Sequence, residues 1–151
     1  MSRVETEILI PASPQDVWNV ALDPQRLEDW VSIHKELHYA PERLPLRPGD
    51  EIVQTLVLRG APFRVTWTVE QADAPERAVW LGKGPAGSVA RTEYLLEPGK
   101  GGATRFRYIN DFAPPGGPLG RIASAALVGD APRREAEQSL AKLAALFDPD
   151  R

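Results

Sequence analysis

The chain has 151 residues, which is enough for one domain with a full hydrophobic core, so we expect a single domain over 1–151. Its net charge of -3 and its scattered basic residues argue against a nucleic-acid-binding surface. The lack of cysteine excludes disulfides, thiol nucleophiles and thiolate metal sites, and it fits a reducing cytoplasm. No apolar run approaches the roughly 20 residues that span a bilayer, and the N-terminus does not follow the pattern of a signal peptide. We therefore expect a cytoplasmic protein without a membrane span.

The N-terminal segment predicts one strand followed by two short helices. Residues 4–10 alternate between apolar or small side chains and mostly charged ones, which indicates a strand with one buried face. Ser13 then has the position of a helix N-cap, with Pro14 at the first helical position. A second helix start at Asp23 is followed by apolar residues at helical spacing up to Val31.

The middle of the chain predicts a series of strands with antiparallel connections. Residues 63–70 show the clearest alternation of apolar and polar side chains, which is the period of a strand with one buried face. The glycine-rich segment 98–102 has the composition of a hairpin loop. The predicted extended segments are 33–39, 51–58, 63–70, 78–82, 89–97 and 104–112.

The C-terminal segment predicts a long helix. Apolar or small residues recur at steps of three and four over residues 119–147, which gives one helix face. Pro132 lacks a backbone N–H and its ring crowds the carbonyl four residues earlier, so one straight helix is unfavourable. The helix either kinks at Gly129–Pro132 or breaks there, with Asp130 as a new N-cap. Arg133 interrupts the apolar stripe, either at a cavity mouth where it meets an anionic head group or as a solvated residue.

Three groups of residues resemble motifs of a known superfamily. They are residues 10–14 (IPASP) with the tryptophan and proline positions up to residue 31, residues 96–98 (LEP) with 101–105 (GGATR), and residues 117–121 (GPLGR). They resemble the START-like (SRPBCC) superfamily, and its polyketide cyclase/dehydrase-like members in particular.

This resemblance covers essentially the whole chain and implies an α+β helix-grip fold. In that fold a curved antiparallel sheet of about seven strands wraps around a long C-terminal helix, and two short helices follow the first strand. The shared residues are caps, turns and packing tryptophans, so the resemblance implies the fold far more than an activity. Relatives typically continue the closing helix through the region of residues 129–132, where this chain departs from them.

A curved sheet around one amphipathic helix leaves space for a ligand, and such pockets are mostly apolar with a few polar groups. Strand alternation places Gln54, Tyr108 and Asn110 on otherwise apolar faces directed at this space. These groups either orient a ligand or bond to one another and to the backbone in a filled core, because leaving one unsatisfied costs about 1–3 kcal/mol. We interpret Trp18 and Trp30 as packing residues of the short helices. The predicted ligand-binding residues are Gln54, Phe63, Trp67, Trp80, Tyr94, Tyr108, Asn110 and Phe112.

Charged residues on the last two predicted strands share the opposite face. The simplest register pairs Arg91, Glu93 and Glu97 with Arg105 and Arg107 in cross-strand ion pairs on the outside of the sheet. The alternative is a catalytic Glu–Arg couple that points inward.

The two histidines, His34 and His38, flank Glu36. In a strand all three side chains point the same way, but the histidines are then roughly 13 Å apart, too far to share one ion. A helical segment would let them converge, and His34 alone is a candidate general base. We expect no metal site and no cofactor.

The first functional hypothesis is the binding of a small hydrophobic or aromatic ligand, lipid or polyketide-like, in a cavity between the sheet and the C-terminal helix. The alternative is an enzyme of the aromatase/cyclase or dehydratase type, in which Tyr94, Tyr108, Asn110, Gln54 or His34 steers proton transfer on a polyketide-like substrate. A third hypothesis, an interaction or chaperone-adaptor domain, requires a large exposed apolar patch. The oligomeric state does not follow from the sequence.

Overall fold

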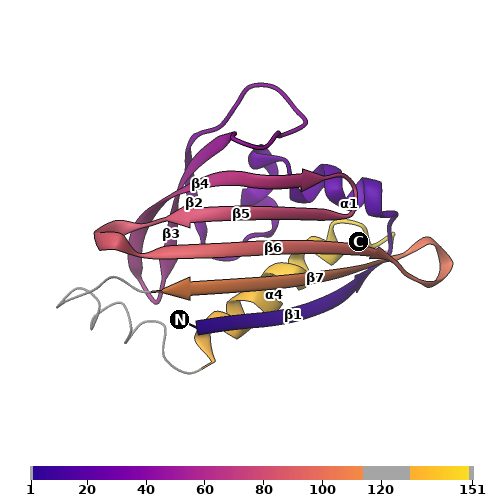
Figure 1. Cartoon of the computed structure of the whole chain (residues 1–151). Helices are drawn as coiled ribbons and strands as arrows, with labels where there is room; N and C mark the ends of the chain where they lie inside the picture. The colour runs from indigo at the N-terminus through magenta and orange to yellow at the C-terminus, as the bar shows by residue number, and fades with distance from the viewer. Residues whose placement is uncertain (1, 114–129, 150–151) are drawn as a thin grey trace.

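The computed structural model describes residues 2–113 and 130–149. Within these residues one antiparallel sheet of seven strands has the order β1-β7-β6-β5-β4-β3-β2, so β1 and β2 are its edges (Figure 1). Two short helices, α1 and α2, follow β1, and α4 closes the chain, which confirms the predicted helix-grip architecture. The elements are β1 Ser2–Ile10, α1 Pro14–Ala21, the 3-10 turn η1 Pro24–Arg26, α2 Leu27–Trp30, β2 His34–Tyr39, β3 Glu51–Leu58, β4 Ala61–Asp73, β5 Arg77–Lys83, η2 Pro85–Gly87, β6 Val89–Pro98, η3 Lys100–Gly102, β7 Thr104–Ala113 and α4 Ala131–Ala145.

The start of α1 follows from its capping residues, as the sequence predicts. The Ser13 Oγ accepts a hydrogen bond from the Asp16 backbone N–H at 3.2 Å, and Pro14 occupies the first turn. The Asp23 carboxylate accepts from the Gln25 N–H at 3.0 Å and starts η1 in the same way. These caps satisfy backbone donors that have no partner at a helix start.

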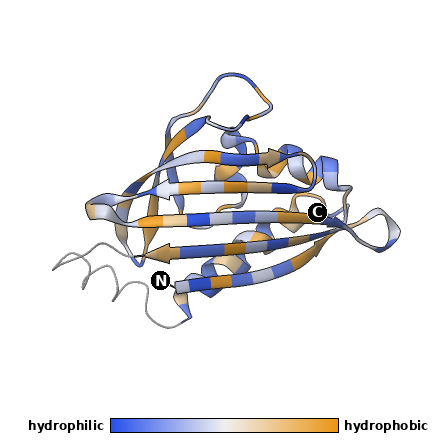
Figure 2. Ribbon diagram, in the orientation of Figure 1, coloured by the Kyte–Doolittle hydropathy of each residue, from blue (hydrophilic) through white to orange (hydrophobic). Residues whose placement is uncertain are grey.

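The strands have two distinct faces, because successive side chains alternate across a sheet. The inner face carries the apolar positions, and its residues Val4, Ile10 and Phe106 are buried. The outer face carries most of the charged ones, and Leu9, next to the buried Ile10 on β1, is 60% exposed there. Figure 2 shows hydrophilic and hydrophobic residues alternating along the strands.

The core lies between the inner face of the sheet and the helices. Trp30 of α2 is 2% exposed and stacks edge-on against Phe106 of β7, with ring centroids 6.5 Å apart. Val17 and Leu143 are fully buried in the same cluster. Burying one such side chain contributes about 1.5–3 kcal/mol, so this cluster fixes the helices on the sheet.

Helix α4 packs against β1 and α2 and begins where the predicted break lies (Figure 1). Pro132 sits in its first turn, a position that requires no intrahelical N–H bond, and Asp130 is the N-cap residue, although its side chain makes no cap hydrogen bond. Leu140 and Leu143 of the predicted stripe are buried. The predicted first half of the helix, residues 119–129, lies outside the described residues.

Of the two interpretations of Arg133, the structure supports the solvated residue, whereas the predicted ion pairs between the last two strands are wrong. Arg133 is exposed and donates from Nη1 to the Glu5 backbone carbonyl of β1 at 3.1 Å, so it helps to hold α4 on the sheet edge. Arg107 does not pair with an acid of β6 but donates to the Glu5 carboxylate of β1 at 2.7 Å. Arg105 likewise lies 3.9 Å from Glu7 of β1. The β1–β7 register explains these partners, because Arg107 lies diagonally across from Glu5, and Arg105 lies diagonally across from Glu7.

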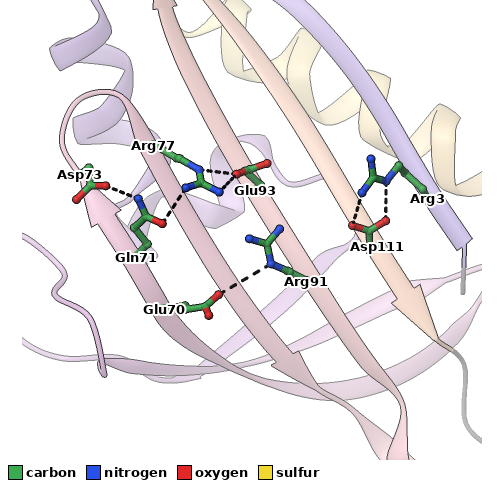
Figure 3. Close-up of polar contacts among 8 residues, drawn as sticks. All are labelled: Arg3, Glu70, Gln71, Asp73, Arg77, Arg91, Glu93 and Asp111. Carbon is green, nitrogen blue, oxygen red and sulfur yellow. Dashed lines mark hydrogen bonds and ion pairs between the residues drawn. The ribbon is translucent and has the colours of Figure 1, made fainter.

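The β6 charges are on the outer face, as predicted, but the partners of Glu93 and Arg91 lie on β5 and β4. Glu93 pairs with Arg77 of β5, and Arg91 lies 3.9 Å from Glu70 of β4 (Figure 3).

Among the described residues, no helix is both long and apolar enough to cross a membrane.

Candidate ligand-binding cavity

A cavity of about 420 Å³ lies between the inner face of the sheet, α2 and α4. This volume falls in the range of roughly 300–1,000 Å³ that is usual for small-molecule sites. Apolar side chains make up most of its wall. All eight residues that the sequence predicts for ligand binding line it: Gln54, Phe63, Trp67, Trp80, Tyr94, Tyr108, Asn110 and Phe112.

A chain of hydrogen bonds runs from the cavity wall to β2. The Trp67 Nε1–H donates to Gln54 Oε1 at 2.7 Å, and Gln54 Nε2 lies 2.8 Å from His34 Nδ1. An indole nitrogen can only donate, so Trp67 fixes which end of the buried Gln54 amide is the oxygen. The amide nitrogen must then donate to His34. Two of the polar atoms of Gln54 are therefore already occupied by protein partners.

This hydrogen-bond chain also fixes the state of His34. Its Nδ1 accepts a hydrogen bond, so the neutral ring carries its proton on Nε2. Burial lowers the pKa of His34, because desolvation disfavours the charged imidazolium. Although Gln54 lines the cavity, His34 itself lies behind it, so the position does not support His34 as a general base in the cavity.

The interpretation that the two histidines point the same way is wrong. Irregularities in the β2–β3 register separate His34 from Glu36 and Leu37 from Tyr39. As a result His34 bonds to Gln54 on the inner face, whereas His38 Nε2 lies 2.6 Å from Thr55 Oγ1, one residue along β3 and therefore on the outer face. The two rings cannot share one ion.

Three cavity residues, Trp80, Thr92 and Asn110, form one row across β5, β6 and β7. Trp80 pairs with Thr92, and Thr92 pairs with Asn110. The Thr92 hydroxyl donates to Asn110 Oδ1 at 3.1 Å, which leaves the Asn110 amide nitrogen for another partner. Asn110, which alternation predicts for the inner face, thus bonds to Thr92 through its side-chain oxygen and also lines the cavity.

The next row places two tyrosines side by side. Tyr94 and Tyr108 are register partners, with ring centroids 6.1 Å apart. Burial raises the pKa of Tyr94, and burial raises the pKa of Tyr108 to about 12, although a hydrogen bond with Thr92 opposes the second shift. Both phenols are therefore neutral at physiological pH.

Sequence reasoning missed Trp30, which lines the cavity in addition to packing in the core. Leu27 of α2 and Val31, which directly follows α2, line the cavity as well. Helical spacing shows that these residues share a face, but it does not show whether that face meets side chains or a void. Trp18, by contrast, is buried in the core and does not contribute to the cavity wall, as predicted.

Helix α4 supplies the wall opposite the sheet. Ala136 and Leu140 face the cavity, together with Glu135. The Glu135 carboxylate accepts a hydrogen bond from the Ser32 hydroxyl at 2.7 Å, and Ser139 accepts from the Ser32 backbone N–H at 2.9 Å. These bonds hold α4 against the segment that follows α2.

One glycine makes room for an aromatic wall residue. A Cβ atom at Gly82 would lie 2.6 Å from the Trp67 ring, a distance that real Cβ contacts do not reach. Gly82 and Trp67 are register partners on β5 and β4. The missing side chain lets the indole lie over β5 and reach Gln54.

A second hollow, of about 710 Å³, is an open groove beside the loop that joins β2 to β3. Two of its charged groups pair with each other: Arg43 donates to Asp50 at 2.6 and 3.0 Å, and the Arg47 N–H donates to the same carboxylate at 2.7 Å. The Arg43 guanidinium holds the pKa of Asp50 below its usual range. The smaller, apolar cavity is the better candidate for a ligand site.

Comparison with known proteins agrees with this architecture. Residues 1–148 match the family described as polyketide cyclase / dehydrase and lipid transport. The chain belongs to this family. The match covers nearly the whole chain and agrees with the SRPBCC-type resemblance of the sequence.

Relatives in the polyketide cyclase/dehydrase family include two mycobacterial proteins. The uncharacterized protein Rv1546 of Mycobacterium tuberculosis is 33% identical over 150 residues, covering 97% of this chain and 99% of the relative. A protein named Toxin Rv0910, from the same species, is 28% identical over 133 residues, with 86% and 90% coverage. The crystal structure of TTHA0849 from Thermus thermophilus has a TM-score of 0.75 at 21% identity and covers 95% of each chain, which shows the shared fold.

Proposed function

We propose that this protein binds a small hydrophobic or aromatic molecule in the cavity between the sheet and α4. The observation that carries this proposal is the cavity itself, about 420 Å³ in volume and lined mainly by apolar side chains. Aromatic rings on three strands, such as Trp67, Trp80 and Phe112, offer flat surfaces for stacking. The family, which is described by polyketide cyclisation and lipid transport, supports a ligand of this class.

Binding is favoured over catalysis by the chemistry of the wall. The two phenols, Tyr94 and Tyr108, have raised pKa values and are poor bases at neutral pH. The carboxylate of Glu135 is hydrogen-bonded to Ser32, and His34 is behind Gln54. An adaptor role is not favoured either, because the exposed large apolar residues of the described chain are spread over β1, β2, the β2–β3 loop, β5 and β6. They are Leu9, Tyr39, Leu44, Leu81 and Val89.

Thermal denaturation with a panel of uncharged aromatic compounds and lipids tests the proposal. A ligand at about 100 times its Kd stabilises the folded state by about 2.7 kcal/mol, which raises the melting temperature by roughly 5–10 °C for a chain of this size. Polar compounds of similar size, such as sugars, serve as controls and should produce no shift. If no member of a broad apolar panel shifts the transition, the proposed function is wrong.

A further inference from the structure

A chain of hydrogen bonds connects the cavity wall to a histidine outside it. Trp67 donates its indole N–H to Gln54 at 2.7 Å, and the Gln54 amide nitrogen donates to His34 Nδ1, 2.8 Å away. Trp67 and Gln54 line the cavity, whereas His34 does not. His34 is half-buried on β2, so protons can reach its ring from solvent. The chain therefore links a group that titrates near neutral pH to the wall of the ligand site.

The direction of these hydrogen bonds depends on the charge of His34. The indole nitrogen can only donate, so the Gln54 oxygen faces Trp67 and the amide nitrogen faces His34. Neutral His34 completes the chain because its Nδ1 accepts, whereas an imidazolium carries N–H groups on both nitrogens and can only donate. Protonation sets two donors against each other, and Gln54 must then turn its oxygen toward His34. This turn places the amide nitrogen against the Trp67 N–H, so Trp67 loses its acceptor.

The surroundings of His34 determine the pH at which this change occurs. Burial lowers the pKa of His34, and the negative charge of Glu28 on α2 opposes this shift without cancelling it. On the β3 side the ring meets the uncharged Gln54, and Leu56 is its register partner. The neutral, accepting ring is therefore the form present at pH 7.5, and the imidazolium forms on mild acidification.

The hydrogen bond to Gln54 fixes the orientation of Trp67 in the wall. The Trp67 ring lies against Gly82 of β5, where a Cβ atom would be only 2.6 Å away. This surface has no side chain, so it supports the ring without giving the indole N–H an acceptor in place of the Gln54 oxygen. An unpaired donor is unfavourable, so the indole turns away from Gln54 when the oxygen is lost. The surface on which an aromatic ligand stacks then changes.

We propose that His34 is a positioning residue for the cavity: its neutral ring holds Trp67 in the wall through Gln54, and its protonation releases Trp67 and weakens ligand binding. The inference rests on the proposed function and adds to it a dependence on pH. A residue behind the wall thereby controls how tightly the cavity binds its ligand.

Titration with N-phenylnaphthylamine at pH 7.5 and pH 5 tests the inference, because this diarylamine stays uncharged at both values. The unaltered protein should bind it at least about threefold more weakly at pH 5, as expected when one hydrogen bond of the wall is lost. His34→Asn keeps an acceptor oxygen close to the position of Nδ1 but cannot take up a proton. Its affinity should match that of the unaltered protein at pH 7.5 and persist at pH 5. His38→Asn, whose partner Thr55 is on the outer face, should retain the pH dependence.

Trp67→Phe shows whether the effect passes through the indole. Phenylalanine has no N–H, so the Gln54 amide can turn toward a protonated His34 without leaving a donor unpaired. The ratio of the two affinities should therefore approach one in Trp67→Phe, whatever the affinity of this variant at pH 7.5. A full pH dependence in folded Trp67→Phe or His34→Asn overturns the inference.

A ligand-free measurement covers the case in which a variant does not fold. In ¹H–¹⁵N spectra of the unaltered protein, the Trp67 indole N–H signal should move upfield between pH 7.5 and pH 5, because its bond to Gln54 is lost. The Trp18 signal, from a core residue outside the cavity wall, is the internal reference. An unmoved Trp67 signal, or equal affinity at both pH values, overturns the inference and leaves the proposed function intact. If N-phenylnaphthylamine binds at neither pH, both fail.

Discussion

The outer and inner faces of the sheet differ in whether their polar side chains have hydrogen-bond or ion-pair partners within the protein. On the outer face they pair with one another: Arg3 binds both oxygens of Asp111 at 2.7 and 3.1 Å. Arg77 contacts Glu93 and also donates to Gln71 at 3.0 Å (Figure 3). The Arg3 guanidinium holds the pKa of Asp111 below its usual range, which is the effect of a satisfied ion pair.

On the inner face some of the polar groups are satisfied and others are not. Gln54 is bonded on both sides, by Trp67 and His34, whereas the Trp30 and Trp80 N–H groups are buried without partners among the described residues. The described ion pairs of the outer face thus join polar groups to one another, whereas the inner face keeps two buried donors without a described partner.

The largest expected effect is on stability, and it comes from comparing Gly82 with Leu81. These adjacent residues of β5 lie on opposite faces of the sheet. Gly82→Ala places a methyl group against the rigid Trp67 ring on the inner face, and such overpacking should lower the free energy of unfolding by about 1–3 kcal/mol. Leu81→Ala changes an outer residue that is 40% exposed, and its effect should be smaller, about 1 kcal/mol or less.

Urea denaturation of both variants measures these changes. The Trp67 indole N–H signal should also shift in Gly82→Ala, because the indole must move away from Gln54. If Gly82→Ala is as stable as the unaltered protein and this signal is unmoved, the close packing of Trp67 over β5 is incorrect.

A smaller effect is expected on the pH dependence of stability. It distinguishes the two histidines, whose hydrogen-bond partners lie on opposite faces of the sheet. Burial lowers the pKa of His34 in the folded state, so below the unfolded pKa of about 6.5 the unfolded chain binds a proton more readily. The stability contribution of neutral His34 is therefore present above that pH and is lost as the pH falls through the folded pKa. Protonation would also set an N–H against the Gln54 amide nitrogen.

The melting temperature between pH 7.5 and pH 5 measures this dependence. His34→Gln should flatten the loss of stability on acidification, whereas His38→Gln, whose partner Thr55 is on the outer face, should retain it. Identical pH profiles for the unaltered protein and His34→Gln would show that His34 does not titrate differently in the folded and unfolded states.

The sequence predicts the strands and the cavity wall well because both depend on alternation. A period of two assigns the inner residues of β3 and of residues 63–69 in β4 without knowledge of the partner strands, so it places Gln54 and Trp67 correctly. The capping of α1 was predictable for a similar reason, since Ser13 and Pro14 act on their immediate neighbours.

What the sequence could not predict depends on register and on contacts between distant elements. Because of the bulges in β2, His34 and His38 lie on opposite faces of the sheet. These bulges are evident only from the pairing of β2 with β3. The partner of Arg107 is on β1, about one hundred residues away in the chain, because β1 joins the sheet beside β7. Trp30 joins the cavity wall only through the docking of α2.

Titration with the neutral fluorophore N-phenylnaphthylamine tests the central claim, that the cavity holds a ligand, most directly. The unaltered protein should enhance its fluorescence saturably with one site per chain. Ala136→Leu on α4 extends a side chain into the cavity and should weaken binding at least about tenfold, which corresponds to about 1.4 kcal/mol. Ala141→Leu, exposed on the same helix, should bind as the unaltered protein does. Equal binding by all three folded proteins, or none by any, would contradict a ligand site between the sheet and α4.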